Sequence, residues 1–171
     1  MSMETSAIHK LVHAEFAAAV GPLEPCPYGD SIEVDAARIA DVAAFMKSHD
    51  DLRFDSLSNL TGVDFPDREK IEVVYELYSY THGHSIVLKV DSPREAPTAK
   101  TVCGVWRAAE WLEREAYDLV GIIFQGHRDL RRILLPDDWV GFPLRKDYVE
   151  APDYHGISTV RESILNIENR H

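Results

Sequence analysis

Alternating apolar and polar positions predict two neighbouring strands in the middle of the chain. In 71–80 every second residue from 71 to 77 is apolar, and 85–91 repeats the pattern; the apolar positions are Ile71, Val73, Tyr75, Leu77, Ile86, Leu88 and Val90. Side chains two apart in a strand share one face of a sheet. The residues between them, Thr81 to His84, include Gly83 and indicate a turn. The pattern therefore predicts an antiparallel hairpin.

Helical spacing of apolar residues predicts a helix at the N-terminus and a second one after residue 35. The first spans 7–20, with Ser6 as its cap and Gly21-Pro22 as its end. The second follows Asp35, an expected N-cap, and its inner face holds Ile39, Val42, Ala43 and Met46. Between the two helices, the Pro- and Gly-rich stretch 21–30 is expected to be a loop.

Two shorter segments complete the N-terminal half. Ile32 and Val34 indicate a short strand, because apolar residues alternate there. In 52–65 the apolar period fits a helix and a strand equally well, so its type stays open.

A third helix is predicted for 99–120, capped by Thr98 and ended by Gly121. Its apolar stripe comprises Val105, Ala109, Leu112, Ala116 and Leu119. A charged stripe with alternating signs, made of Glu110, Arg114 and Asp118 at intervals of four, is expected to pair along the opposite face. The run 122–124 is too short for another helix. Beyond Leu135 three prolines, Pro136, Pro143 and Pro152, predict extended, irregular chain.

Composition bounds the class of protein. With 171 residues, 45% hydrophobic and 27% charged, the chain is expected to form one globular domain with a tail. Its net charge of −11 argues against nucleic acid and against direct adhesion to anionic lipid. No apolar run reaches the ~20 residues of a membrane-spanning helix, and the N-terminus lacks a signal-peptide pattern. Cys26 and Cys103 form no CxxC motif, so no cysteine framework for an iron–sulfur cluster or structural zinc is expected.

Charge is distributed unevenly. From Glu113 to Tyr148 the chain has seven acidic and six basic residues, so this segment is net −1 and the remainder carries −10. The basic residues form two clusters, Arg128 with Arg131 and Arg132, and Arg145 with Lys146. They can bind an anion or a partner's carboxylates, or they can pair internally with Asp118, Asp129, Asp137, Asp138 and Asp147. Both interpretations stay open.

Few residues suit a catalytic or metal site. His9 and His13 have the i, i+4 spacing of two metal ligands but no third ligand nearby, and His82 and His84 flank a turn glycine. Glu113 and Glu115 point to different faces of a helix, so ion pairs with Arg114, Arg131 or Arg132 are expected instead of acid–base catalysis. Phosphate-loop, dinucleotide and serine-nucleophile motifs are missing. One enzymatic hypothesis remains, in which His127, Arg131 and Asp118 surround an anion.

A longer signature is more specific. The chain reads EREAYDLVGIIFQGH, then DLRRILLPDD, then PLRKDY, between Glu113 and Tyr148. This run resembles the C-type subunit, also called the 30 kDa-type subunit, of NADH-quinone oxidoreductase, in the peripheral arm of respiratory complex I. The resemblance extends more weakly over 50–150. Two positions depart from the family pattern. Arg128 stands where the family usually has proline, and Phe142 stands where histidine or tyrosine is common.

The resemblance implies an α/β (α+β) fold. Its features are a two-layer domain, a mixed or antiparallel sheet packed with helices, and an extended C-terminal tail that wraps a neighbouring subunit. We accordingly divide the chain into an N-terminal helix (1–21), an α/β core (22–135) and an extended docking segment (136–171). The signature positions are expected to serve structure or partner binding: Glu113, Arg114, Glu115, Asp118, Gly121, His127, Asp129, Arg131, Arg132, Pro143, Arg145, Lys146 and Asp147.

The resemblance further implies a non-catalytic scaffold subunit without catalytic, cofactor or metal residues of its own. The complex would use FMN, iron–sulfur clusters, NADH and quinone, and would couple electron transfer to proton translocation. Expected partners are the large quinone-site subunit (D-type) and the cluster-bearing subunit (B-type), on the cytoplasmic side of the cell membrane. The alternative hosts are a membrane-bound NiFe hydrogenase, a formate hydrogenlyase and a quinone reductase fed by ferredoxin or a deazaflavin.

Overall fold

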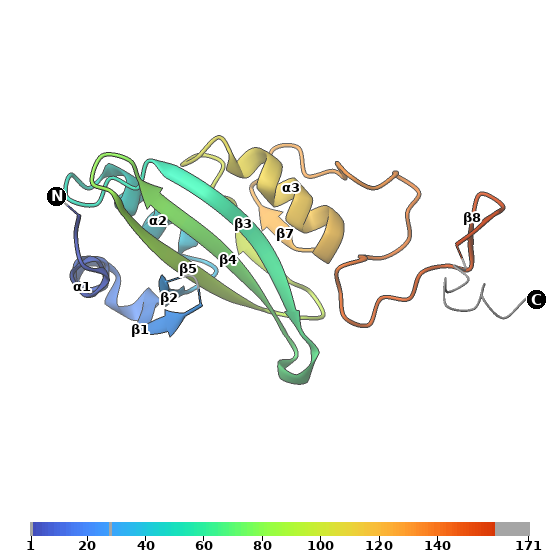
Figure 1. Cartoon of the computed structure of the whole chain (residues 1–171), viewed down its shortest axis with the longest axis horizontal. Helices are drawn as coiled ribbons and strands as arrows, with labels where there is room; N and C mark the ends of the chain where they lie inside the picture. Colours follow the sequence, from blue (N-terminus) through green and yellow to red (C-terminus); the bar gives the residue numbers. More distant parts are fainter. Residues whose placement is uncertain (1, 28, 160–171) are drawn as a thin grey trace, which may run out of the picture.

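A five-stranded mixed sheet forms the centre of the molecule, in the order β1-β2-β5-β4-β3 (Figure 1). The computed structural model describes residues 2–27 and 29–159. Neighbouring strands are antiparallel except β2 and β5, which are parallel. The strands are β1 (Val20–Cys26), β2 (Gly29–Val34), β3 (Ser56–Phe65), β4 (Lys70–Ser79) and β5 (His84–Pro93).

The predicted hairpin is confirmed as β4 and β5. Tyr75 lies opposite Leu88 and Leu77 opposite Ile86. Alternate residues of β4 are buried along its whole length, as a strand with one face on the core requires. The ambiguous segment 52–65 is largely strand β3, which joins β4 through a short 3-10 helix, Pro66–Arg68.

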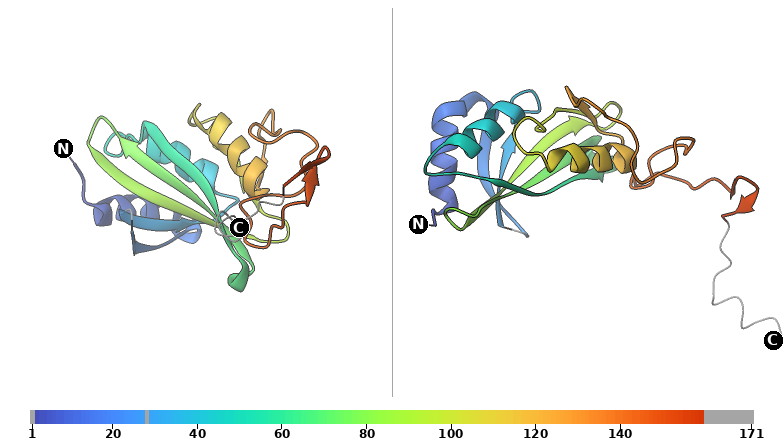
Figure 2. Two further views of the ribbon diagram at one scale, coloured as in Figure 1. Left: turned by 45° about the vertical axis from the view of Figure 1, so that its right-hand side comes forward. Right: turned by 90° about the horizontal axis from the view of Figure 1, so that it is seen from above.

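Three helices complete a two-layer architecture, and this confirms the predicted α/β class. They are α1 (Thr5–Phe16), α2 (Ile39–Ser48) and α3 (Ala109–Val120). Their buried side chains join those of the sheet in one hydrophobic cluster, and Figure 2 shows α2 and α3 on the same side of the strands. The predicted inner face of α2 is buried.

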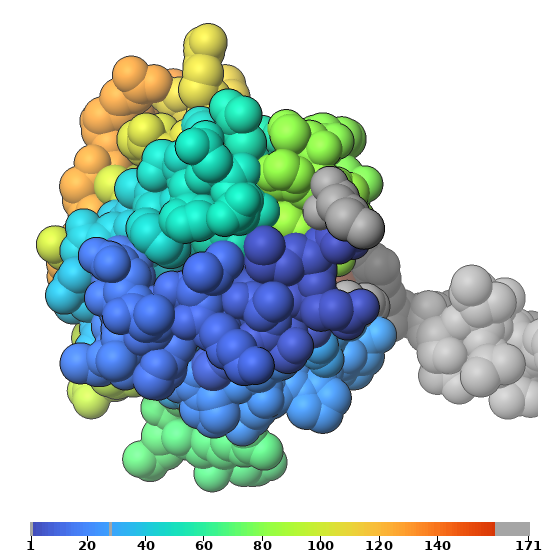
Figure 3. Space-filling view, turned by 90° about the vertical axis from the view of Figure 1, so that its left-hand side faces the viewer, coloured from blue at the N-terminus to red at the C-terminus, as the bar shows by residue number. Residues whose placement is uncertain are grey.

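Described residues before position 50, which the signature resemblance was not expected to reach, contribute to this core. Ile8 and Val12 of α1 are fully buried in the same cluster as the sheet residues. Figure 3 shows this end of the molecule, where α1 lies against the segment that contains α2.

The predicted loop 21–30 is wrong, because β1 and the start of β2 occupy most of it. β1 carries Pro22 and Pro25 but lies at the edge of the sheet, where a missing N–H costs no ladder bond. The first helix is also shorter than predicted, because it ends at Phe16 and a 3-10 turn (Ala17–Ala19) follows. Ser6 lies inside the helix and therefore does not cap it. Asp35 is no helix cap; its carboxylate accepts from the N–H of Ala37 in the turn before α2.

The predicted helix 99–120 is half wrong. Thr98 begins a strand, β6 (Thr98–Lys100), which pairs in parallel with β7 (Ile123–Gln125). Turns follow, and α3 starts only at Ala109. Ala99, Val102 and Trp106 have helix-like spacing and are buried, but the pairing with β7 uses the backbone of 98–100. Gly121 ends the helix as predicted, in the left-handed conformation with φ +88°.

From Gly126 onward the chain leaves the core as a C-terminal arm, here defined as residues 126–159 (Figures 1 and 2). The expected irregular chain after Leu135 is confirmed over 136–152, where neither helix nor strand is present. A two-strand hairpin, β8 (Asp153–Tyr154) and β9 (Ile157–Ser158), follows. Residues 160–171 of the predicted docking segment lie outside the described residues.

Candidate functional site

The buried Asp118 of α3 fixes the first part of the arm. Its side chain is fully buried. One carboxylate oxygen accepts from Arg132 at 2.8 Å, and the other accepts three backbone N–H groups, of Ile133, Leu134 and Leu135, at 2.7–3.0 Å. Burial by itself would raise the pKa of Asp118. Its hydrogen bonds have the larger combined effect and lower the pKa; they come from the N–H of Leu135, the Arg132 guanidinium and the N–H groups of Ile133 and Leu134. The carboxylate thus holds a bend of the arm in its ionised form.

A second buried carboxylate, Asp64 of β3, fixes the arm further along. Arg94 binds Asp64 with two hydrogen bonds of 2.6 and 2.9 Å and also reaches Asp147 of the arm at 2.6 Å. The N–H of Lys146 donates to Asp64 at 2.8 Å. The Arg94 guanidinium, opposed in part by burial and assisted by this N–H, lowers the pKa of Asp64. Asp64 and Arg94 were missing from the expected site residues, although the stretch LTGVDF that carries Asp64 belongs to the weaker resemblance.

Phe142 and Arg145 pack the arm against the end of α3. The Arg145 guanidinium donates to the carbonyl of Val120 at 2.8 Å and lies over the Phe142 ring, 5.0 Å from its centre. Arg132 lies over the same ring at 5.5 Å. Phe142 also contacts Gly121, where an added Cβ would lie 2.7 Å from the ring. Phe142 therefore supplies an aromatic face for two guanidinium groups.

We expect Gly121→Ala to lower the free energy of unfolding by about 1.5 kcal/mol, because an alanine is strained at positive φ and would displace Phe142. Thermal denaturation measures the change. Gly83→Ala is the matched control, since Gly83 also has positive φ (+72°) but nothing within 4 Å of an added Cβ. Equal losses in the two variants would contradict the contribution of Phe142.

The predicted charged stripe of α3 is wrong. Glu110, Arg114 and Asp118 do not pair with one another, and Arg114 and Asp118 are buried beneath the arm. Arg114 donates to the carbonyls of Arg131 and Arg132, both at 3.2 Å, and no carboxylate pairs with it among the described residues. The face that was expected to pair with itself is the face that the arm covers.

Glu113 and Glu115 also differ from expectation. Glu113 is fully buried and has no ion pair with any described residue. It accepts from the Thr101 hydroxyl at 2.6 Å, the Val102 N–H at 2.7 Å and the Cys103 thiol at 3.3 Å. Burial raises the pKa of Glu113 despite these three hydrogen bonds. Glu115 is exposed, and its side chain has no hydrogen bond or ion pair to another described residue.

The remaining basic residues at the start of the arm lie at the surface. Arg128 forms a two-point ion pair with Glu110, and Arg131 pairs with its neighbour Asp129 at 3.0 Å. Such exposed pairs contribute little stability. Arg131 is 70% exposed while Asp118 is fully buried, so these two groups and His127 do not surround a shared anion. The enzymatic hypothesis built on them is therefore not supported by the geometry.

The two histidine pairs form no metal site with three ligands among the described residues. The rings of His9 and His13 are 5.5 Å apart, and His9 contacts the carbonyl of Gly21. His82 and His84 lie 5.5 Å apart and contact the carbonyls of Asp50 and Leu52. Carbonyl contacts account for both turn histidines.

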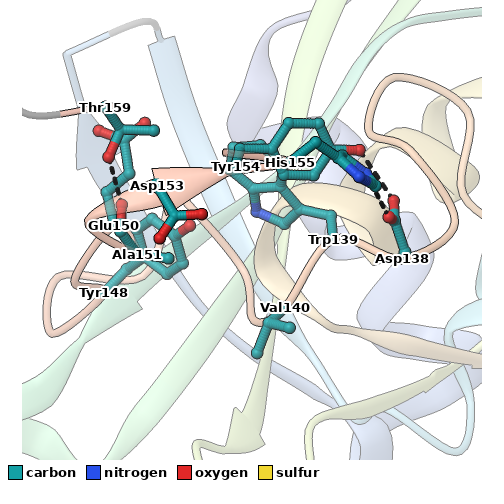
Figure 4. Close-up of a pocket in the computed structure, with 10 residues that line it drawn as sticks. All are labelled: Asp138, Trp139, Val140, Tyr148, Glu150, Ala151, Asp153, Tyr154, His155 and Thr159. Carbon is teal, nitrogen blue, oxygen red and sulfur yellow. Dashed lines mark hydrogen bonds and ion pairs between the residues drawn. The ribbon is translucent and has the colours of Figure 1, made fainter. Parts of the chain in front are cut away.

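Outside its anchors the arm exposes apolar side chains. Their exposed fractions run from 55% to 85%, in Leu134, Val140, Leu144, Val149 and Ile157. The arm also contains a recess with aromatic walls and an acidic rim (Figure 4). There Asp138 accepts from the Tyr154 hydroxyl at 2.9 Å and bonds His155 at 2.8 Å, and the rings of Trp139 and Tyr154 lie 5.7 Å apart. Exposed apolar side chains on an extended segment are typical of a surface that binds another protein.

Comparison with known proteins decides the family. The family model for the 30 kDa subunit of respiratory-chain NADH dehydrogenase matches residues 32–154. The chain belongs to this 30 kDa-subunit family. The C-type subunit of NADH-quinone oxidoreductase from Chlorobium phaeobacteroides is 43% identical over 155 residues, which cover 88% of this chain and 92% of the relative. The resemblance expected from the signature is thus confirmed, and it starts earlier than residue 50.

Other relatives of the 30 kDa-subunit family come from different complexes. The C-type subunit of F(420)H(2) dehydrogenase from Methanosarcina mazei is 41% identical over 121 residues, 70% of this chain and 75% of the relative. A chain in the structure of the membrane-bound sulfane sulfur reductase, an archaeal respiratory membrane complex, aligns with a TM-score of 0.71 at 25% identity. The alignment covers 86% of both chains. The chain is therefore a subunit of a complex I-type assembly. None of its described helices has the length and apolar character to cross a membrane.

Proposed function

We propose that the chain is a non-catalytic scaffold subunit of a complex I-type NADH:quinone oxidoreductase. That complex passes electrons from NADH through iron–sulfur clusters to quinone and couples the transfer to proton translocation. The observation that carries the scaffold role is the arm. Its charged signature residues are used to anchor it to α3 and β3, and its apolar side chains remain exposed. A segment held in this way is shaped for contact with a neighbouring subunit.

The charged signature residues and the apolar residues of the arm then have different roles. Asp118, Arg132, Arg145 and Asp147 hold the arm in place, and the apolar residues between them contact the partner. We infer that the arm lies against the large quinone-site subunit and the cluster-bearing subunit, on the cytoplasmic side of the membrane. Redox cofactors, including FMN and the iron–sulfur clusters, would belong to partner subunits. The two separate cysteines support this, since a cluster needs about four thiolate ligands.

A second host is a related complex with another electron donor. The F(420)H(2) dehydrogenase relative favours it, because its similarity to this chain is close to that of the NADH-linked relative. The arm would serve the same role there, since the donor would bind another subunit. The subunits that co-purify with the tagged chain from its host's membranes distinguish the hosts: a flavin-containing NADH module favours the first, and a different donor module the second.

We expect Val140→Asp and Val149→Asp each to weaken the affinity for the partner about tenfold. Burial of each valine side chain against the partner would stabilise the complex by about 1.5 kcal/mol. Quantitative pull-down of the quinone-site subunit by the tagged chain measures the change. Both valines are more than four-fifths exposed, so the variants should fold normally. Tyr80→Asp is the control, because Tyr80 is 77% exposed and lies in the turn between β4 and β5. Undiminished capture by both arm variants would refute the docking role.

A further inference from the structure

Glu113 presents a problem that the scaffold role does not solve. It is fully buried, and no described cation pairs with it. The hydroxyl of Tyr75, which is also fully buried, has no hydrogen-bond partner among the described residues and lies within electrostatic reach of Glu113. Burying a carboxylate without a counter-ion is unfavourable. Among the described residues, no ion pair compensates the charge of Glu113; three hydrogen bonds hold its carboxylate, beside the imidazole of His127.

Two metal-binding side chains lie beside this carboxylate. One ligand atom each of Cys103, Glu113 and His127 lies within 4.8 Å of the other two. The Cys103 sulfur and the Glu113 Oε2 are 3.3 Å apart. In a tetrahedral zinc site, adjacent ligand atoms are separated by about 3.3–3.4 Å for nitrogen and oxygen and by about 3.5–3.7 Å where one of them is sulfur, as follows from the usual metal–ligand bond lengths. Side-chain shifts on the order of 1 Å would bring all three atoms to that spacing.

The position of His127 also suits a ligand. One ring nitrogen, Nε2, faces the carbonyl of Glu110 at 3.2 Å, and Nδ1 accepts the N–H of Asp129 at 3.1 Å. A metal would bind Nδ1 in place of the Asp129 N–H, and Nε2–H would keep donating to the Glu110 carbonyl and orient the ring, as in most metal-bound histidines. Cys103 and His127 are partly exposed, so an ion can reach the site from solvent.

We propose that Cys103, Glu113 and His127 bind a divalent transition-metal ion, with zinc as the best fit to one sulfur, one oxygen and one nitrogen ligand and a water in the fourth position. The ion would connect the loop after β6, helix α3 and the first turn of the arm. This proposal goes beyond the scaffold role and does not depend on it. The expectation that no residue binds metal rested on the resemblance and on the spacing of the histidines and cysteines; these three residues are 10 and 14 positions apart, too far for a local motif.

Cobalt binding to the purified full-length chain tests the site directly. A thiolate bound to Co²⁺ gives a charge-transfer absorption band in the near ultraviolet, so we expect the band in the unmodified chain and in Cys26→Ser, and its loss in Cys103→Ser. Cys26 is a matched control, since the chain has only these two cysteines and both are partly exposed. A band that persists in Cys103→Ser, or the absence of any band at excess Co²⁺, would overturn the proposal.

Zinc gives a second readout that separates this site from the other histidines. At a hundredfold excess of Zn²⁺ over Kd we expect Tm to rise by roughly 5–10 °C. The rise should be lost in His127→Gln and kept in a double His9→Gln/His13→Gln variant; the reverse outcome would refute the site. Alkylation of the unmodified chain tests the site without any substitution, so a misfolded variant cannot affect the result. Zinc should slow the alkylation of Cys103 and leave Cys26 reactive. Equal alkylation of both cysteines with zinc present would also count against it.

Discussion

Asp118→Asn is expected to lower the free energy of unfolding by about 3 kcal/mol, the cost of removing one partner from a buried ion pair. The asparagine cannot serve three backbone N–H groups and Arg132 at once, because one of its two polar atoms is a donor. For a chain of this length the loss corresponds to a Tm about 6–12 °C lower, measured by thermal denaturation. Glu115→Gln is the control, since Glu115 is exposed on the same helix.

Acid titration gives the same prediction a second test. The pKa of Asp118 is lowered in the folded state, so its stabilisation is present above the unfolded value of 3.8 and is lost as pH falls through the folded pKa. Glu113 acts in the opposite direction, because its pKa is raised in the folded state. Its contribution to stability is present below the unfolded value of 4.5 and is lost as pH rises through the folded pKa. The difference between wild type and Asp118→Asn isolates the Asp118 effect. It should shrink below about pH 4; a difference independent of pH would contradict the role of the ionised carboxylate.

Asp64→Asn is expected to release the arm locally. Asp64 accepts from Arg94 and from the N–H of Lys146. Removing the charge leaves Arg94 without its buried partner and weakens the attachment by about 3 kcal/mol. Local opening would then become roughly a hundredfold more frequent, since each 1.4 kcal/mol is a factor of ten.

Limited proteolysis measures this opening. Trypsin cleaves after Arg145 and Lys146, which the folded arm holds against Val120 and Asp64. We expect cleavage at these two sites to accelerate by roughly a hundredfold in Asp64→Asn, because proteolysis of an opened segment tracks its population. Asp67→Asn is the matched control, since Asp67 is exposed in the 3-10 turn directly after β3, three residues from Asp64. Similar cleavage rates in the two variants would show that Asp64 does not anchor the arm.

Local patterns in the sequence determined much of the fold. Alternation over 71–80 and 85–91 predicted the β4–β5 hairpin, because a strand with one buried face repeats every two residues. The apolar face of α2 followed from its helical period, and Gly121 marked the end of α3. The signature between Glu113 and Tyr148 identified the family, and the comparisons confirmed it.

Tertiary structure decided which charges are buried. The spacing of Glu110, Arg114 and Asp118 predicted a stripe that pairs with itself, but the arm lies over this face. Arg114 donates to a backbone carbonyl of the arm, and Asp118 accepts from Arg132 and from backbone N–H groups of the arm. Arg94 and Asp64 are 30 residues apart, and Arg94 reaches Asp147 because the arm passes the ends of β3 and β5. Periodicity records which side chains share a face, not what covers that face.

The same limit explains the errors in the elements and in the candidate metal site. β6 exists because its backbone pairs with β7, more than twenty residues later, and β1 tolerates its prolines because it is an edge strand. Cys103, Glu113 and His127 come together through the packing of a loop, a helix and the arm. The sequence by itself thus determined the family, the class of fold and the segment that carries the family signature, Glu113 to Tyr148. Only the folded chain separated the charges that anchor the arm from the apolar side chains left for a partner, because both depend on contacts between distant residues.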